Sequence, residues 1–309
     1  MSELKFQDPN VTAAGDVRAR VAFAGYKTIW FNTGTLCNLT CKNCYIESSP
    51  TNDRLVYISH SDVTAVLDEA ERLGERLEEI GFTGGEPFMN PEFMDILAAC
   101  LARGYPVLVL TNAMRPMHHL KPRLIELSKL YQGQLGIRVS LDHFEQAGHE
   151  DLRGARSWQP TIDGLIWLAA NGFRVSVAGR TVWGKSDADM RAGYARLFQS
   201  LNLGIDAHNP AKLVLFPEMD EQANVPEISE GCWSKLHIKP TDLMCANSRM
   251  VVRRKDSQRV SVVACTLLPY DPAFDLGSTL ESARISISLN HRHCARFCVL
   301  GGASCSAAK

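Results

Sequence analysis

Residues 37–45 read CNLTCKNCY, and this cysteine loop places Cys37, Cys41 and Cys44 directly after a β-rich run at residues 28–32. Three thiolates on one tight loop can bind three irons of a [4Fe–4S] cube and leave the fourth iron without a protein ligand. A zinc site would need a fourth protein ligand nearby, and unconnected loop thiols are the other alternative. The position after a first strand favours the cube, whose open iron predicts a site for a substrate or cofactor.

Around this loop, short β-rich runs alternate with helical stretches from residue 27 to about residue 218. Strands are predicted at residues 28–32, 77–83, 106–111, 136–141, 173–181 and 212–216. The alternation predicts an α/β fold in which helical crossovers join parallel strands. Six units are too few for a closed eight-stranded barrel, so we expect a partial (β/α)6 barrel with its active site at the C-terminal strand ends.

The alternation stops after residue 226. The rest of the chain contains a predicted β-hairpin, at residues 249–254 and 259–264, and a loop-rich stretch that carries several cysteines. Its apolar pattern is thin, and a metal centre can supply the stability that such a small core lacks. We therefore expect an N-terminal arm at residues 1–26, a partial-barrel domain at residues 27–227 and a small domain at residues 228–309.

A second motif, Gly84-Gly85-Glu86-Pro87, follows the second predicted strand. Glycine lets the backbone approach a ligand closely, and a carboxylate can bind an ammonium group. Together with the cysteine loop, this turn resembles the signature of the radical S-adenosylmethionine (SAM) superfamily. The resemblance implies that SAM chelates the open iron of a [4Fe–4S] cluster on the cysteine loop, with Glu86 and the backbone of Gly84 and Gly85 holding its amino group.

The resemblance also implies the chemistry. Reductive cleavage of SAM gives a 5′-deoxyadenosyl radical, which abstracts hydrogen from a substrate carbon held over the barrel mouth. Family members usually carry an aromatic residue before the third cysteine, close to the adenine, whereas this chain has Asn43 there and Tyr45 after the cysteine. Tyr45 is therefore the aromatic candidate for a contact with the cofactor.

Alternation along the predicted strands points further polar side chains into the barrel. In IRVSLD, residues 137–142, the apolar positions should pack on the outer helices, which leaves Ser140 and Asp142 at the inner tip. Arg180 falls near the mouth, where an inward arginine needs an anion, and Asn112 ends the third strand. We predict that these four residues bind the cofactor and that Asp142 and Arg180 serve catalysis; strand-end capping is the alternative role.

Five further cysteines lie near the C-terminus. Cys245 and Cys265 flank the predicted hairpin, and Cys294, Cys298 and Cys305 follow within HRHCARFCVLGGASC. Five thiols are one more than a [4Fe–4S] cluster needs. The arrangement resembles the auxiliary-cluster module called twitch, related to the longer SPASM domain, and this implies a second [4Fe–4S] cluster. The hairpin brings Cys245 and Cys265 together and the short Cys294–Cys298 interval supplies two more ligands, so we expect Cys305 to be the spare.

The spacing of this C-terminal group differs from that of its relatives. Three residues separate Cys294 from Cys298, where the relatives commonly have two. Zinc is the alternative metal, with His291 or His293 joining the thiolates, because thiolate-rich sites suit both metals.

The composition and charge of the chain argue against a nucleic-acid-binding protein and a membrane protein, and its cysteines point to metal. A formal net charge of −1 and a pI near 6.7 give no overall attraction to nucleic acid. No apolar run is long enough to cross a bilayer and the N-terminus lacks a secretory signal, so we expect a cytoplasmic protein without a membrane partner. Thiols stay reduced in that compartment, so the eight of ten cysteines that lie in clusters point to metal.

The resemblance implies a radical SAM enzyme of oxidoreductase type, served by an electron donor such as flavodoxin or ferredoxin. Oxidation of a small molecule, by dehydrogenation or bond formation through the auxiliary cluster, is the favoured hypothesis, because the first strand begins at residue 28 and leaves no room for an N-terminal peptide-recognition domain. A peptide or protein maturase that recruits its substrate through a partner is the alternative, and a non-catalytic iron–sulfur or zinc sensor is the third. Asp142, Arg180, His208 and Glu218 are candidates for the general base.

Overall fold

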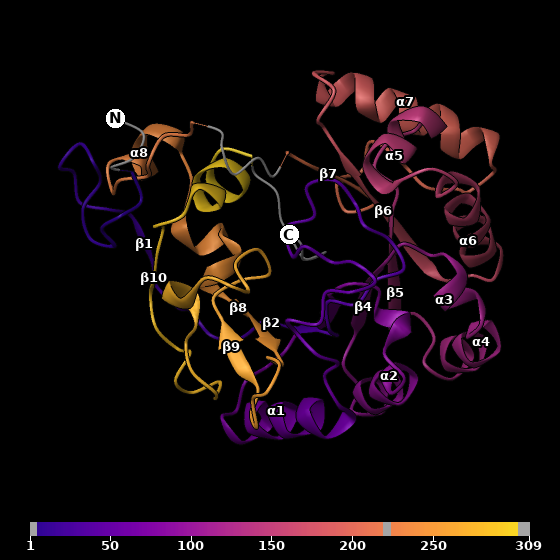
Figure 1. Ribbon diagram of the computed structural model, residues 1–309, viewed down its shortest axis with the longest axis horizontal. Helices are drawn as coiled ribbons and strands as arrows, with labels where there is room; N and C mark the ends of the chain where they lie inside the picture. Colours follow the sequence, from indigo (N-terminus) through magenta and orange to yellow (C-terminus); the bar gives the residue numbers. More distant parts are fainter. Residues whose placement is uncertain (1–4, 219–223, 302–309) are drawn as a thin grey trace.

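The computed structural model describes residues 5–218 and 224–301, and its centre is an eight-stranded sheet (Figure 1). The strands are β2 (Thr28–Asn32), β3 (Glu79–Thr83), β4 (Val107–Thr111), β5 (Leu135–Ser140), β6 (Arg174–Arg180), β7 (Leu213–Phe216), β8 (Ser248–Val252) and β9 (Ser261–Val263). Strands β2 to β7 are parallel and fall at the six predicted positions. The order β7-β6-β5-β4-β3-β2-β8-β9 leaves β7 and β9 at opposite edges, so the described strands form an open barrel, and the predicted fold class is confirmed.

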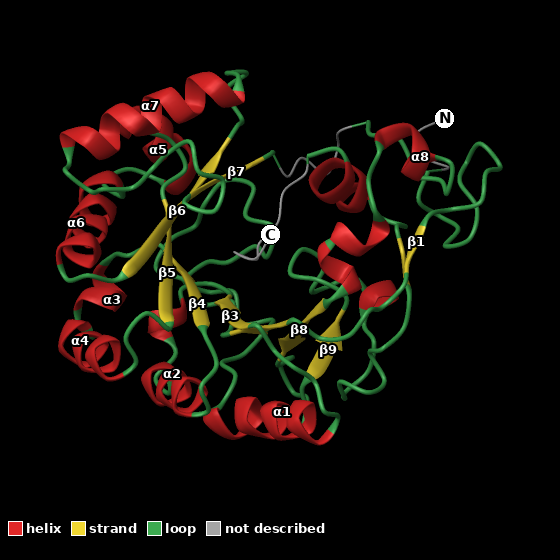
Figure 2. Ribbon diagram, turned by 180° about the vertical axis from the view of Figure 1, so that it is seen from behind, coloured by secondary structure: helices red, strands yellow, loops and turns green. Residues whose placement is uncertain are grey.

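Helices cover the outer face of this sheet, as Figures 1 and 2 show. They are α1 (His60–Arg72), α2 (Phe93–Ala102), α3 (Arg115–His118), α4 (Lys121–Leu130), α5 (Gln146–Arg153), α6 (Trp158–Ala170) and α7 (Asp187–Ser200), with a short 3₁₀ turn, η2 (Pro87–Met89), before α2. A reciprocal capping box between Ser59 and Asp62 starts α1. Ile137 and Val139 of β5 are fully buried in the core shared with these helices, as strand alternation predicts.

The C-terminal region lies on the inner side of the same sheet. The predicted hairpin forms, with β9 antiparallel to β8, and β8 also pairs in parallel with β2, so that the hairpin extends the barrel sheet. A second buried core joins Trp30 and Leu108, from the inner side of the barrel, to Met250, Phe274 and Ala295. The other elements here are α8 (Cys232–Leu236), η3 (Pro240–Asp242), η4 (Met244–Ala246), η5 (Pro272–Phe274), β10 (Ile287–Ser288) and a π-helical turn, η6 (Cys294–Val299).

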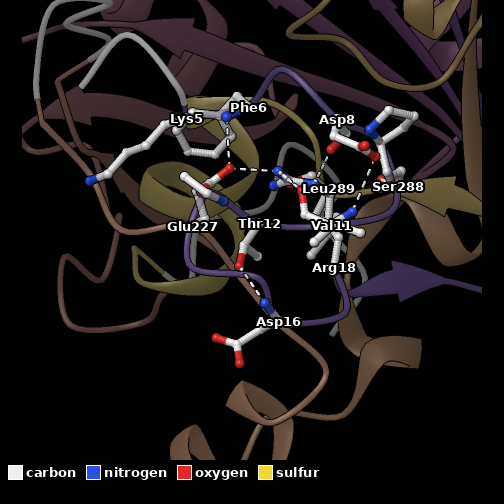
Figure 3. Close-up of polar contacts among 12 residues, drawn as sticks. Lys5, Phe6, Asp8, Val11, Thr12, Asp16, Arg18, Glu227, Ser288 and Leu289 are labelled. Carbon is white, nitrogen blue, oxygen red and sulfur yellow. Dashed lines mark hydrogen bonds and ion pairs between the residues drawn. The ribbon is translucent and has the colours of Figure 1, made fainter. Parts of the chain in front are cut away.

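The N-terminal arm packs on this C-terminal region. Its strand β1 (Arg20–Val21) pairs antiparallel with β10, near the other end of the chain. Arg18, which is 1% exposed, lies among polar groups of the arm, Glu227 and Leu289 (Figure 3). The arm therefore joins the cysteine-rich region rather than standing apart from the fold.

Candidate active site

The three cysteines of the cysteine loop line one pocket at the C-terminal ends of the barrel strands. The residues that share this pocket with them include Tyr45, Thr83, Gly84, Gly85, Thr111, Asn112, Ser140, Asp142, Arg153, Ala178, Arg180 and Phe216. All three are free thiols. Burial, followed by the charge of Glu86, raises the pKa of Cys37 to about 12, and burial also raises the pKa of Cys41. A metal that binds Cys37 and Cys41 must therefore displace their protons.

Backbone contacts fix the cysteine loop on both sides. The N–H of Cys37 donates to the carbonyl of Ser49 at 3.0 Å, and the N–H of Lys42 donates to the carbonyl of Leu152 in α5 at 2.7 Å. The thiol sulfur of Cys37 also accepts the N–H of Leu39 at 3.4 Å. The loop is thus held by the segment that follows it and by the last turn of α5.

The diglycine turn packs directly against the start of the cysteine loop. The N–H of Gly85 donates to the carbonyl of Gly34 at 2.7 Å, and the N–H of Glu86 donates to the carbonyl of Leu36 at 3.1 Å. A Cβ on Gly85 would lie 2.0 Å from the carbonyl oxygen of Leu36, and one on Gly84, whose φ is +139°, would lie 2.6 Å from that of Gly34. Glycine is needed because two backbones meet here, a reason additional to the predicted approach of a ligand.

Glu86 is buried, at 1% exposure, and its carboxylate points to the end of β4. One oxygen accepts the hydroxyl of Thr111 at 2.7 Å, and the other accepts the backbone N–H of Asn112 at 2.9 Å. Burial raises the pKa of Glu86 to about 7, against the lowering effect of these donors. The side chain joins the diglycine turn to β4, and its predicted contact with the amino group of the cofactor stays a prediction.

Asp142 lies in the pocket as predicted, but it has a partner that the sequence did not reveal. Arg153, at the end of α5, donates from Nε to Oδ2 at 2.7 Å and from Nη2 to Oδ1 at 3.3 Å. The backbone N–H of Asp142 also donates to Nδ1 of His149 at 3.3 Å. The strand-tip carboxylate is therefore engaged within the protein, and Arg153 adds a cation to the pocket lining.

Arg180 presents an unpaired donor in the pocket. Its Nη1 donates to the carbonyl of Lys42 at 3.4 Å. Its Nη2 is buried and has no hydrogen-bond partner within the part of the chain that the structure describes. A buried guanidinium N–H without an acceptor costs free energy, so this atom calls for an oxygen supplied by a ligand.

The remaining predicted cofactor residues lie around the same pocket. The side-chain amide of Asn112 donates to Oδ1 of Asn38 at 2.9 Å, and the hydroxyls of Tyr45 and Thr83 lie 3.3 Å apart. Ser140 lines the pocket at the tip of β5. Polar residues at the ends of β3, β4, β5 and β6 therefore lie together at the mouth of the barrel.

The two further general-base candidates occupy different places. Glu218 follows β7, and its carboxylate accepts the side-chain amide of Asn43 at 2.7 Å, next to the cysteine loop. His208 is exposed and precedes the first residue of β7, which puts it at the opposite end of that strand from the pocket. His208 is therefore wrong as a candidate for the general base.

One wall of the pocket is apolar. Phe216, at the end of β7, stacks on Phe297 of η6 with ring centroids 5.3 Å apart and planes inclined by 23°. Leu110, Ala178 and Leu267 are further apolar residues of the pocket lining. The C-terminal region thus closes one side of the barrel mouth.

Four of the five predicted C-terminal ligands lie in or against the same apolar core. Cys245 and Cys294 are buried, and Cys265 and Cys298 are partly buried beside them. Burial raises the pKa of Cys294, and the charges of Cys265 and Cys245 raise it further. Cys305 lies outside the described residues.

The histidines beside this group have other contacts. Nδ1 of His291 accepts the backbone N–H of His293 at 3.1 Å, and the two rings lie 4.6 Å apart. Burial lowers the pKa of each to about 4. Within residues 5–218 and 224–301, no group of three or more His, Cys, Asp or Glu residues is arranged to hold a single metal ion. A cube needs no such convergence, because each of its ligands binds a different iron.

A family model described as the radical SAM superfamily matches residues 31–197, which is more than half of the chain. The chain belongs to the radical SAM superfamily. This radical SAM protein is 34% identical over 143 residues to the antilisterial bacteriocin subtilosin biosynthesis protein AlbA of Bacillus subtilis, with 46% of this chain and 30% of AlbA covered. It is 28% identical over 137 residues to the mycofactocin maturase MftC of Mycobacterium tuberculosis, with 44% of this chain and 33% of MftC covered.

The sequence matches cover only part of each relative, and the structural match shows the fold alone. The chain spans about a third of the length of the curated relatives that it matches. In structure it resembles Streptococcus suis SuiB, which was crystallised with S-adenosylmethionine, with a TM-score of 0.58, 11% identity and coverage of 82% of this chain and 63% of SuiB. That likeness shows the partial-barrel fold. No helix in the described ranges is both long and apolar enough to span a membrane.

The pocket of this radical SAM protein fits a [4Fe–4S] cluster and SAM. Three free thiols on one loop can bind the cluster, and the unpaired Nη2 of Arg180 offers a donor to a carboxylate or hydroxyl oxygen. Polar groups from β3 to β6 surround the same space. Membership of the superfamily supports both cofactors on independent grounds.

Proposed function

We propose that this radical SAM protein modifies a peptide substrate. The observation that carries the proposal is that two curated relatives are named a bacteriocin biosynthesis protein and a maturase. This supports the peptide alternative better than the oxidation of a small molecule, which the sequence favoured. The number of residues before β2 carries no weight, because the chain spans only part of those relatives.

The chemistry of the pocket agrees with such a substrate. Its polar half, around the cysteine loop and the tips of β3 to β6, suits the cofactor. Its apolar wall, built on the Phe216–Phe297 stack, suits an apolar side chain of a peptide, because a polar group there would lose its hydrogen bonds to water. The same wall keeps water away from the reacting centre.

When bound, the cluster and SAM supply a 5′-deoxyadenosyl radical that removes hydrogen from a substrate carbon. The protein holds that machinery in place. We assign Arg180 to an anionic group of the cofactor or substrate, and Tyr45, Asn112 and Ser140 to polar contacts with the cofactor. Asp142 acts as a positioning residue, because its carboxylate holds Arg153 in the pocket wall.

The C-terminal cysteines form the second part of the proposal. Cys245, Cys265, Cys294 and Cys298 would hold an auxiliary [4Fe–4S] cluster, with Cys305 as the spare ligand. Four thiolates leave no open iron, which suits electron transfer better than coordination of substrate. The division into a barrel domain at residues 27–227 and an auxiliary-cluster domain at residues 228–309, and an electron donor such as flavodoxin or ferredoxin, belong to the same proposal.

Anaerobically reconstituted, reduced protein tests the proposal. It should form 5′-deoxyadenosine from SAM and change the mass of a precursor peptide encoded beside its gene. Replacing the three cysteines of the cysteine loop by alanine should abolish both and lower the iron content from about eight to about four per chain. Cys100→Ala is the matched control, because Cys100 is a fully buried core residue outside the pocket.

The outcomes separate the hypotheses. Undiminished cleavage of SAM in the triple variant would contradict the radical cluster. Cleavage coupled to a small molecule, with every neighbouring peptide unchanged, would favour the first hypothesis again. Protein that binds iron but never cleaves SAM would fit the sensor.

A further inference from the structure

A buried ion pair fastens the N-terminal arm to the C-terminal region. Nη2 of Arg18 lies 2.5 Å from a carboxylate oxygen of Glu227, with side-chain exposures of 0% and 6%. The same guanidinium donates to backbone carbonyls of Asp8 at 2.7 Å, Val11 at 3.0 Å and Leu289 at 3.4 Å. Figure 3 shows Arg18 between these segments, which lie far apart in the sequence.

Glu227 receives further donors from the arm. Its oxygens accept the backbone N–H of Phe6 at 2.7 Å and that of Ala13 at 2.6 Å. The carboxylate therefore holds two turns of the arm as well as Arg18. A pair so buried and so fully hydrogen-bonded leaves a costly unmatched charge when either partner is removed.

Beyond this ion pair, the arm binds the backbone next to Cys245 and the strand that precedes the Cys294 segment. The N–H of Ala24 donates at 2.7 Å to the carbonyl of Ala246, the neighbour of Cys245. The N–H of Leu289, five residues before Cys294, donates at 3.0 Å to the carbonyl of Ala19, next to the β1–β10 pairing. One continuous segment thus touches both cysteine-bearing stretches.

Phe23 of the arm also covers Arg249, which binds the backbone carbonyl of Cys245. Arg249 is fully buried, and its Nη1 donates to the carbonyl of Cys245 at 2.6 Å. The guanidinium of Arg249 lies over the ring of Phe23, 4.5 Å from its centroid. Removal of the arm would expose this guanidinium and loosen the turn that carries Cys245.

We propose that residues 5–26, the described part of the arm, are a structural part of the C-terminal cysteine site. The arm fixes the Cys245 and Cys294 segments relative to each other, and the Arg18–Glu227 pair holds the arm in place. Sites that bind metal need ligands whose positions are set by surrounding contacts. The role in metal binding rests on the proposed auxiliary cluster, whereas the placement of the two thiols does not.

Thiol reactivity of the full-length, metal-free protein tests the placement directly. Arg18→Ala should raise the rate of iodoacetamide labelling at Cys245 and Cys294 roughly ten-fold or more, because both thiols are protected by a region that the arm stabilises. Labelling of Cys100, which is buried in the barrel core, should stay unchanged. Arg20→Ala is the matched control, because Arg20 is exposed and its side chain bonds only to Ser286 among the described residues.

Iron measurements add the second readout. Anaerobically prepared Arg18→Ala should lose about four irons per chain and keep the iron of the cysteine loop. If wild type binds only about four irons while labelling still rises in Arg18→Ala, the arm proposal stands and the auxiliary cluster falls. Unchanged labelling at Cys245 and Cys294, with a protease now cutting the arm, would overturn the arm proposal.

If Arg18→Ala unfolds the whole chain and so exposes Cys100, a second, milder variant tests the proposal. Glu227→Gln keeps the size and most hydrogen-bonding capacity of the side chain and removes its charge. Faster labelling at Cys245 and Cys294 than at Cys100 in this variant supports the proposal. Equal acceleration at all three thiols refutes it.

Discussion

Asp142 and Arg153 form a two-contact ion pair beside the cysteine loop, with Nε to Oδ2 at 2.7 Å and Nη2 to Oδ1 at 3.3 Å. Their side chains are 6% and 15% exposed. The pair joins the tip of β5 to the end of α5, whose Leu152 carbonyl accepts the N–H of Lys42 in the cysteine loop. The ion pair therefore fixes the end of α5, which in turn holds the cysteine loop through the hydrogen bond between Lys42 and Leu152.

Asp142→Ala should destabilise the metal-free protein by about 3 kcal/mol, because it removes the partner of the largely buried charge of Arg153. Urea unfolding followed by circular dichroism measures the change. Asp151→Ala is the matched control: its ion pair with Lys42 is 54% and 63% exposed, and pairs so exposed contribute about 1 kcal/mol or less. Equal losses in the two variants would show that the Asp142–Arg153 pair has no special role.

Gly85→Ala should disturb the cysteine loop, because the new Cβ would lie 2.0 Å from the carbonyl oxygen of Leu36. We expect a loss of about 1–3 kcal/mol in the free energy of unfolding and poor loading of the cluster on the cysteine loop. Iron content and unfolding of the same preparation measure both effects. Gly231→Ala, whose Cβ would have its nearest neighbour at 3.8 Å, should change neither.

The sequence predicted what depends on local pattern. The six parallel strands follow from the alternation of β-rich runs with helical stretches. The pocket positions of Ser140, Asp142 and Arg180 follow from the period of two along a strand. The resemblance to the radical SAM superfamily, rather than spacing, implied that the cysteine loop and the diglycine turn serve one site. These features need no knowledge of how distant segments meet.

The missed features depend on how helices and the arm pack, which local patterns do not determine. Arg153 meets Asp142 only because of where α5 lies, and nothing in the sequence around it marks that pairing. Arg18 meets Glu227 across 209 positions of sequence, so the arm at residues 1–26 gave no sign of its place in the C-terminal region. His208 was predicted from its residue type alone, and residue type does not show at which end of the barrel a residue lies.

Arg180→Ala should weaken SAM binding about ten-fold or more, since it removes a charged donor whose Nη2 has no acceptor within the described chain. Anaerobic calorimetry with SAM measures the affinity. Arg180→Lys should restore it only in part, because an ammonium cannot reproduce the geometry of the guanidinium. Arg174→Ala, exposed at the opposite end of β6, is the control, and unchanged affinity in Arg180→Ala would assign the guanidinium to the substrate instead.

The raised pKa of Glu86 predicts that its contribution to the stability of the folded protein falls as the pH rises. Burial raises its pKa from an ordinary value of 4.5 to about 7 in the folded protein. Between these values the native protein keeps a proton that the unfolded chain has released, so the stability that this proton provides is full below pH 4.5 and is lost as the pH rises through 7. The loss should amount to about 3 kcal/mol.

Glu86→Gln tests this prediction, because the amide does not titrate. Urea unfolding of metal-free protein from pH 5 to pH 8 should show the stability of wild type falling relative to that of the variant as the pH rises. His149, His291 and His293 have pKa values lowered to about 4 by burial and contribute with the opposite sign, so only the difference between wild type and variant isolates Glu86. Tyr105→Phe, at a partly exposed carboxylate contact on the outer surface, serves as the control and should leave the slope unchanged. A difference that stays constant across this range would mean that the hydrogen bonds from Thr111 and Asn112 keep Glu86 ionised throughout.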